Sequence, residues 1–117
     1  MNFDDAIKAH SSWKMKLSQY LKSPDHSLKA SDIQPDNLCE LGRWIYGEGK
    51  KFSTEADFTA LRDAHAHFHK CAADVVRRAD SGQNVSEEIT LGAKSEFSQA
   101  SNAVVQAIMN LRRKIGV

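Results

Sequence analysis

The chain has 117 residues, with 16 basic and 15 acidic side chains, five histidines and two cysteines. This length is enough to bury the core of one domain without disulfide bonds, so we expect a single domain over residues 1–117. The balanced charge argues against nucleic-acid binding through a clustered basic surface, and no apolar run is long enough to insert into a membrane. The N-terminus has no signal peptide, which predicts a cytoplasmic protein with reduced cysteines.

A first helix is predicted from an N-cap at Asn2 to about Lys22, where Ser23-Pro24 ends it. Its apolar positions recur at helical spacing: Phe3, Ile7, His10, Leu17 and Leu21. This pattern places His10 on the buried side. Residues 23–36 hold both prolines of the chain and are predicted to form an irregular connection.

A short helix is predicted next, because Asn37 and Glu40 have the spacing of a capping box and two glycines, Gly47 and Gly49, end the segment. Cys39 falls in the first turn of this helix, near its positive end. A helix N-terminus favours the thiolate form of a cysteine.

Two long helices complete the chain. One is predicted from Thr54 to about Ala79, and the other starts at Ser86. The expected core positions of the last helix are Ile89, Ala93, Phe97, Ala100, Val104, Ile108 (or Ala107), Leu111 and Ile115. No segment alternates with the period of a strand, so we predict an all-α fold. It should be an antiparallel four-helix-type bundle of three long helices and one short, cysteine-bearing helix.

The histidines indicate a metal site. His65 and His69 are four residues apart, which stacks their imidazoles on one helix face, and that face is the apolar one. With His10 and Cys39 they form a set of three nitrogens and one sulfur, which suits tetrahedral zinc. His67 should face solvent. Taken singly, His10 is also explained as a hydrogen-bonded core histidine, Cys39 as a small buried side chain, and Cys71 as a packing residue rather than a redox group.

Three stretches resemble the chemoreceptor zinc-binding (CZB) domain of bacterial sensory proteins, and the resemblance covers roughly residues 3–115. They are Ala9-His10-Ser-Ser-Trp13-Lys14, Cys39-Glu-Leu-Gly42-Arg-Trp44-Ile-Tyr46 and Leu61-x3-His65-x2-Phe68-His69-x-Cys71. The resemblance implies that His10, Cys39, His65 and His69 are zinc ligands. It also implies a helical bundle that pairs as a homodimer and passes a signal to an effector of the chemoreceptor or cyclase type.

The function predicted from these observations is regulatory rather than enzymatic. Four protein ligands leave no open position for a substrate, and no other catalytic motif is present. Zinc occupancy or oxidation of Cys39 would change the helix arrangement, which predicts a zinc or oxidant sensor. Two alternatives stay open. One is an interaction module that zinc only staples together. The other is a hemerythrin-like bundle, although this chain has Lys14 and Lys70 where that family needs carboxylates. The acids available to orient the ligands are Asp36, Glu40, Asp63 and Glu96.

Overall fold

The computed structural model describes residues 2–82 and 90–116, and within these ranges the chain is helical with no strand. This confirms the predicted all-α fold. The helices are α1 (Phe3–Lys22), α2 (Ala30–Ile33), α3 (Glu40–Tyr46), the 3-10 helix η1 (Glu48–Phe52), α4 (Ala56–Asp80) and α6 (Glu96–Ile115). None of the described helices combines the length and apolar character needed to cross a membrane.

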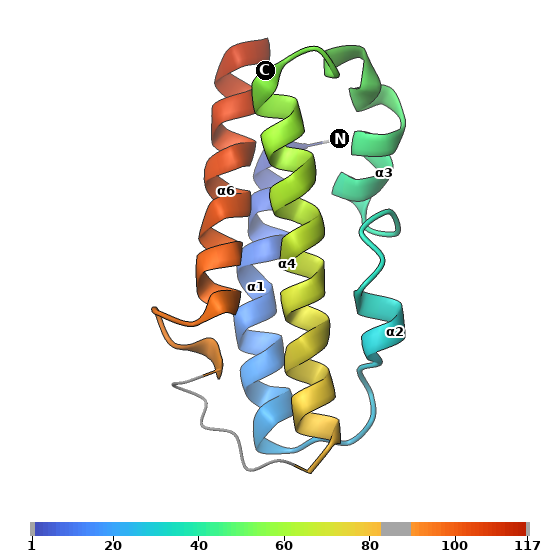
Figure 1. Ribbon diagram of the computed structural model, residues 1–117, viewed down its shortest axis with the longest axis vertical. Helices are drawn as coiled ribbons and strands as arrows, with labels where there is room; N and C mark the ends of the chain where they lie inside the picture. Colours follow the sequence, from blue (N-terminus) through green and yellow to red (C-terminus); the bar gives the residue numbers. More distant parts are fainter. Residues whose placement is uncertain (1, 83–89, 117) are drawn as a thin grey trace.

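The helices form an up-and-down arrangement with four positions (Figure 1). Helices α1 and α4 run in the same direction, and α6 runs in the opposite direction beside them. The chain between α1 and α4 returns along the other side of α4, where α2 and α3 together occupy the fourth position. The predicted four-helix-type bundle is therefore present, with its fourth position divided between two short helices.

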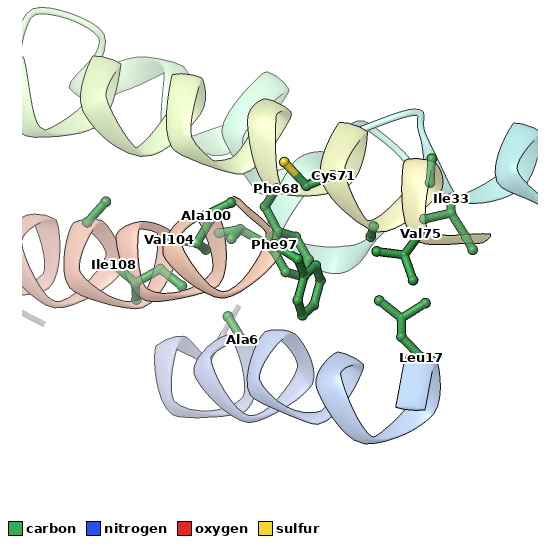
Figure 2. Packing of buried hydrophobic residues seen from close by; sticks show 14 of the residues in the cluster. Ala6, Leu17, Ile33, Phe68, Cys71, Val75, Phe97, Ala100, Val104 and Ile108 are labelled. Carbon is green, nitrogen blue, oxygen red and sulfur yellow. The ribbon is translucent and has the colours of Figure 1, made fainter. Parts of the chain in front are cut away.

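The core lies between α1, α4 and α6. Phe68 of α4 packs against Phe97 of α6 with ring centroids 5.5 Å apart, and Figure 2 shows both rings among aliphatic side chains. The fully buried side chains include Leu17 of α1 and Val104 and Ile108 of α6. Burial of such side chains supplies most of the free energy that holds helices of this length together.

Two predicted helix starts are wrong by one or two residues, and one short helix was not predicted. Asn37 does not cap the short helix, because Cys39 itself is the N-cap of α3. The N-cap of α4 is Glu55 rather than Thr54. Helix α2, inside the connection predicted to be irregular, was missed because four residues are too short to show a helical period.

The last helix is shorter than predicted. Ser86 and Ile89 lie outside the described residues, and helical backbone at residues 90–91 is interrupted before α6 begins. Ser95 is the N-cap of α6, and its hydroxyl accepts a hydrogen bond from the Ser98 N–H at 3.1 Å. Residues 92–95 therefore form a break between the two helical stretches. The Ser98 hydroxyl donates to the Leu91 carbonyl at 2.9 Å, and this hydrogen bond spans the break. Ala93 falls in this break and is exposed, so its predicted core position is wrong.

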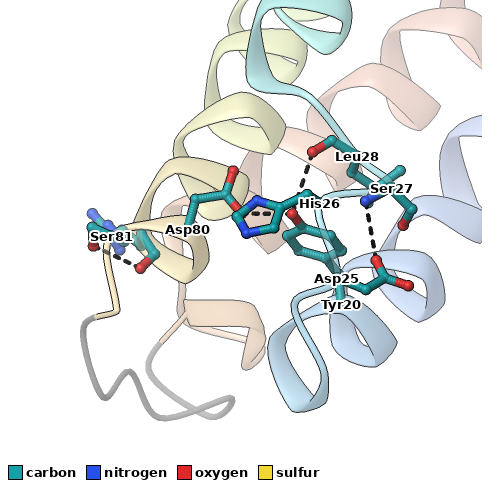
Figure 3. A network of polar contacts seen from close by, with 8 residues as sticks. Tyr20, Asp25, His26, Ser27, Leu28, Asp80 and Ser81 are labelled. Atoms are coloured by element: carbon teal, nitrogen blue, oxygen red, sulfur yellow. Dashed lines mark hydrogen bonds and ion pairs between the residues drawn. The ribbon is translucent and has the colours of Figure 1, made fainter.

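A polar cluster joins the ends of α1 and α4 to the connection that follows α1 (Figure 3). The Tyr20 hydroxyl donates to Asp80 Oδ1 at 2.5 Å, and the Leu28 carbonyl oxygen lies 3.3 Å from the same hydroxyl. This hydrogen bond raises the pKa of Tyr20 to about 12. His26 turns the connection with a φ of 62°, and the Asp25 carboxylate accepts from the Ser27 N–H at 3.0 Å. These contacts hold the beginning of the connection that runs back along α4.

Candidate metal centre

Four side chains from three helices meet inside the bundle: His10 of α1, Cys39 at the start of α3, and His65 and His69 of α4. One nitrogen or sulfur from each lies within 4.8 Å of the others. Cys39 Sγ is 3.2 Å from His65 Nε2 and 3.6 Å from His69 Nε2, and the two Nε2 atoms are 3.0 Å apart. Zinc bonds of about 2.0–2.3 Å in a tetrahedron separate neighbouring ligand atoms by about 3.3–3.6 Å. The observed distances are close to this geometry.

Cys39 is held in place by the backbone of α3. As N-cap, its sulfur accepts a hydrogen bond from the Gly42 N–H at 3.4 Å. Gly42 allows the preceding chain to pass close to the helix, because a Cβ at this position would lie 1.8 Å from the Asp36 carbonyl oxygen. Gly42 thus sets the close packing of the loop before α3 against this helix.

Backbone carbonyls orient two of the three imidazoles. His10 Nδ1 donates to the Ala6 carbonyl at 2.8 Å, and His69 Nδ1 donates to the Ile33 carbonyl at 2.7 Å. Since a carbonyl only accepts, both rings carry their proton on Nδ1 and direct the Nε2 lone pair into the site. Such outer hydrogen bonds are usual for histidines that bind a metal. His65 Nδ1 is buried and has no partner among the described residues.

Within the described residues, none of the four acids considered from the sequence is the hydrogen-bond partner of an Nδ1 atom in the site. Asp36 accepts from the Tyr46 hydroxyl at 2.6 Å, Asp63 contacts Arg62, and Glu96 lies near His67. The Ile33 carbonyl was missed because α2 was missed. The sequence could only have indicated that some carbonyl at a helix end would be free to accept a hydrogen bond, because the carbonyls in the last turn of any helix lack partners within that helix.

Burial makes the site a set of neutral donors. Desolvation, and then the nearby His69 and His10, lower the pKa of His65 to about 3. Desolvation also lowers the pKa of His10. Neutral imidazoles keep the lone pair that a metal needs. Two imidazoles that resist protonation, His10 and His65, beside His69 and one sulfur therefore fit zinc.

The protonation state of Cys39 differs from the one predicted, which was a thiolate favoured by the helix N-terminus. Desolvation raises the pKa of the Cys39 thiol, and the N–H groups of Gly42 and Leu41 only partly oppose this effect. The helix N-terminus is present, but burial outweighs it. In the metal-free protein the sulfur is therefore a thiol, and zinc binding requires loss of its proton.

The remaining histidines and the second cysteine lie outside this site. His67 is exposed, as predicted, and His26 lies in the connection after α1. Cys71 is buried at 5% exposure and is part of the hydrophobic core cluster, in agreement with a packing role. The two tryptophans are partly buried against the core, with Trp44 against Phe3 at a centroid distance of 5.3 Å.

Comparison with known proteins supports the reading of the site. Residues 10–76 match the family described as "Chemoreceptor zinc-binding domain", a range that includes all four converging residues. The chain belongs to this family. Its cofactor is zinc, and its domain type is regulatory.

A diguanylate cyclase, DgcZ of Escherichia coli (strain K12), is similar to the chain. The two are 31% identical over 78 residues, which is 65% of this chain and 26% of that relative. The match thus spans about a quarter of the relative's length. No solved structure matches the chain.

Proposed function

We propose that the chain is a zinc-dependent sensory domain in which His10, Cys39, His65 and His69 bind one zinc ion. The observation that carries the proposal is the convergence of three imidazoles and one cysteine at distances close to those in a zinc tetrahedron. When bound, zinc supplies a Lewis-acidic centre with no position left for a substrate. The proposed role is therefore regulatory and not enzymatic.

The proposed response is a change in the position of α3. Cys39 is the only one of the four residues outside the two long helices, and α3 has seven residues, too few to be stable alone. His69 also holds the Ile33 carbonyl, so α2 is linked to the same point. Zinc occupancy would favour one placement of the segment that contains α2 and α3 against α4.

Cys39 provides a second input, oxidation. A Cys39 thiolate and hypochlorous acid give a sulfenic acid and chloride, in which sulfur loses two electrons, chlorine gains two, and the OH group moves to sulfur. A sulfenic acid is a poorer ligand than a thiolate, so this reaction would release α3. The two branches of the proposal are thus zinc sensing and oxidant sensing at one site.

The output requires a partner. We propose that the domain acts as a cytoplasmic homodimer and controls an effector of the cyclase or chemoreceptor type. The support is the family and the similarity to a diguanylate cyclase. A change in α3 within each protomer would then alter the relative placement of two effector units.

Zinc retention tests the ligand assignment. We expect about one tightly held equivalent after gel filtration of the wild type, and a large loss in Cys39→Ala and His65→Ala. His26→Ala is the matched control, because it removes an exposed imidazole outside the site. Retention of the tight equivalent in both site variants would contradict the assignment.

Hydrogen exchange tests the response. Removal of zinc, or treatment of the zinc-bound protein with hypochlorite, should speed exchange in α3 more than in the middle of α4. Cys39→Ala should abolish the effect of hypochlorite on α3. Equal exchange with and without zinc would favour the alternative of a structural interaction module. A zinc site that stays saturated at every cellular zinc concentration would exclude zinc sensing but not oxidant sensing.

A further inference from the structure

A second cluster of metal-binding residue types lies on the outward side of α4. It contains His67 and Cys71, four residues apart, and Glu96, the first residue of α6. One ligand atom from each lies within 4.8 Å of the others. His67 Nε2 is 3.5 Å from Cys71 Sγ and 3.6 Å from Glu96 Oε1. None of these residues belongs to the first site.

These distances are those of a hydrogen bond and an ion pair, and they also fit zinc coordination. Zinc bonds of about 2.0–2.3 Å to nitrogen, sulfur and oxygen place tetrahedral ligand atoms about 3.3–3.6 Å apart. As an ion pair, His67 and Glu96 would contribute little, because their side chains are 49% and 71% exposed. Imidazole, thiolate and carboxylate together are a ligand set that zinc accepts.

Cys71 is not fully explained by packing. Its residue is only 5% exposed, but Figure 2 shows its sulfur turned away from the labelled apolar side chains of the core. The sulfur instead lies near His67 Nε2. A side chain that served only to fill the core would be expected to point into it.

A small cavity beside the cluster contains an unpartnered polar group. The cavity has a volume of about 40 Å³, and Cys71, Glu96 and Thr90 are among its lining residues. Thr90 is 3% exposed, and its hydroxyl has no hydrogen-bond partner among the described residues. A buried hydroxyl without a partner is costly, and a cavity of this size holds water. The site therefore has room for a water molecule next to a hydroxyl that needs one.

We propose that His67, Cys71 and Glu96 bind a second zinc ion, with water from the cavity as the fourth ligand. Cys71 would release its proton to solvent on binding. The second zinc would link α4 to α6, whereas the first four residues link α1, α3 and α4. Because two of its ligands are exposed and must be ordered, this site is weaker than the first. The chain would then respond to zinc over two concentration ranges.

Zinc titration of the metal-free, full chain tests the proposal. We expect two equivalents in the wild type, the second weaker than the first. Cys71→Ser and His67→Gln should each weaken only the second equivalent, by at least about tenfold, because each removes one of three protein ligands. His67 is exposed, so His67→Gln remains informative if Cys71→Ser does not fold.

Glu96→Gln completes the series, with Glu48→Gln as its matched control. Both variants lose one carboxylate from an exposed position, but Glu48 lies in η1, away from the cluster. We expect a weaker second equivalent in the first variant and wild-type titration in the second. One equivalent in the wild type, or a second equivalent unchanged by Cys71→Ser and His67→Gln, would overturn the proposal.

Cobalt binding in a Cys39→Ala background separates this site from the first. Because Cys71 is then the only cysteine, a near-ultraviolet thiolate-to-cobalt band must come from it. We expect this band with Cys39→Ala and its loss in the Cys39→Ala, Cys71→Ser double variant. Absence of the band from Cys39→Ala would overturn the second site, while loss of the tight zinc equivalent in the same variant would still support the first.

Discussion

The three long helices and the segment from residue 23 to residue 55 are held in place by different interactions. Helices α1, α4 and α6 bury a continuous set of aromatic and aliphatic side chains, so each supports the other two. The segment buries few large side chains, among them Ile33, Leu41 and Ile45. Polar atoms attach it at two further points, the Ile33 carbonyl and the Cys39 sulfur.

This difference suits a sensory domain. Apolar burial does not depend on ligand occupancy, so the long helices form a constant frame. The segment reaches that frame through the same histidines that we propose as zinc ligands. We therefore expect its position to be the part of the fold most sensitive to zinc.

Ile108→Ala should have the largest effect, because it leaves a cavity in the frame. Ile108 is fully buried on α6, and truncations of this kind destabilise proteins by about 2–5 kcal/mol. The free energy of unfolding from urea titration measures the effect. Met109→Ala is the control at the next residue, which is 45% exposed, and we expect a change below about 0.5 kcal/mol. Equal losses in the two variants would contradict the assignment of the core.

Gly42→Ala should act on the segment and the metal site. An added Cβ would lie 1.8 Å from the Asp36 carbonyl oxygen, so the loop before Cys39 must move. Overpacking of this kind costs about 1–3 kcal/mol of stability. We also expect weaker zinc binding, measured by competition with a chelator. Unchanged zinc affinity would show that the position of Cys39 does not depend on this contact.

Acidification should destabilise the metal-free protein through His65. Its pKa is lowered to about 3 in the folded state, so below its usual value near 6.5 the unfolded chain binds a proton that the folded chain does not. Stability is therefore present above about pH 6.5 and falls as the pH decreases toward 3. For this one group the loss is about 1.4 kcal/mol between about pH 7.5 and pH 5.5.

Urea unfolding of metal-free protein at the two pH values measures this loss. His65→Gln, which cannot be protonated in this range, should show a smaller decrease in stability than the wild type. The same decrease in both proteins would mean that other groups, and not His65, carry the pH dependence.

Tyr20→Phe should have the smallest effect. It removes the hydrogen bond to Asp80 that joins the ends of α1 and α4, at a cost of about 1 kcal/mol. Because Tyr20 and Asp80 lie about three helical turns beyond His10 on α1 and His69 on α4, zinc retention should not change. A loss of zinc in Tyr20→Phe would show that the start of the segment, and not only its contact with His69, controls the site.

Much of the site was predictable because helical spacing is a local property. The spacing of His65 and His69 sets both rings on one face, and the same reasoning placed His10 on the buried side of α1. Cys39 was correctly placed at the positive end of a short helix. The state of its thiol was predicted wrongly, because burial is a property of the assembled fold and it outweighs the effect of the helix end.

Features that depend on contacts between elements were not predictable. The Ile33 carbonyl is 36 residues from His69 in the sequence, and nothing in the spacing relates them. The break before Ser95 depends on the hydrogen bond between Ser98 and Leu91, which replaces the missing helical turn. Glu96 joins His67 and Cys71 only because α6 starts beside the outward side of α4.

The sequence by itself thus determined the three long helices and the buried faces that carry His10, His65 and His69, since each depends on periodicity within one helix. Only the tertiary structure decided how those residues are used. Packing set the protonation of His10, His65 and Cys39, supplied backbone acceptors from α1 and α2, and brought Glu96 to the outward face of α4. The physical reason is that desolvation and contacts between helices exist only once the bundle has formed.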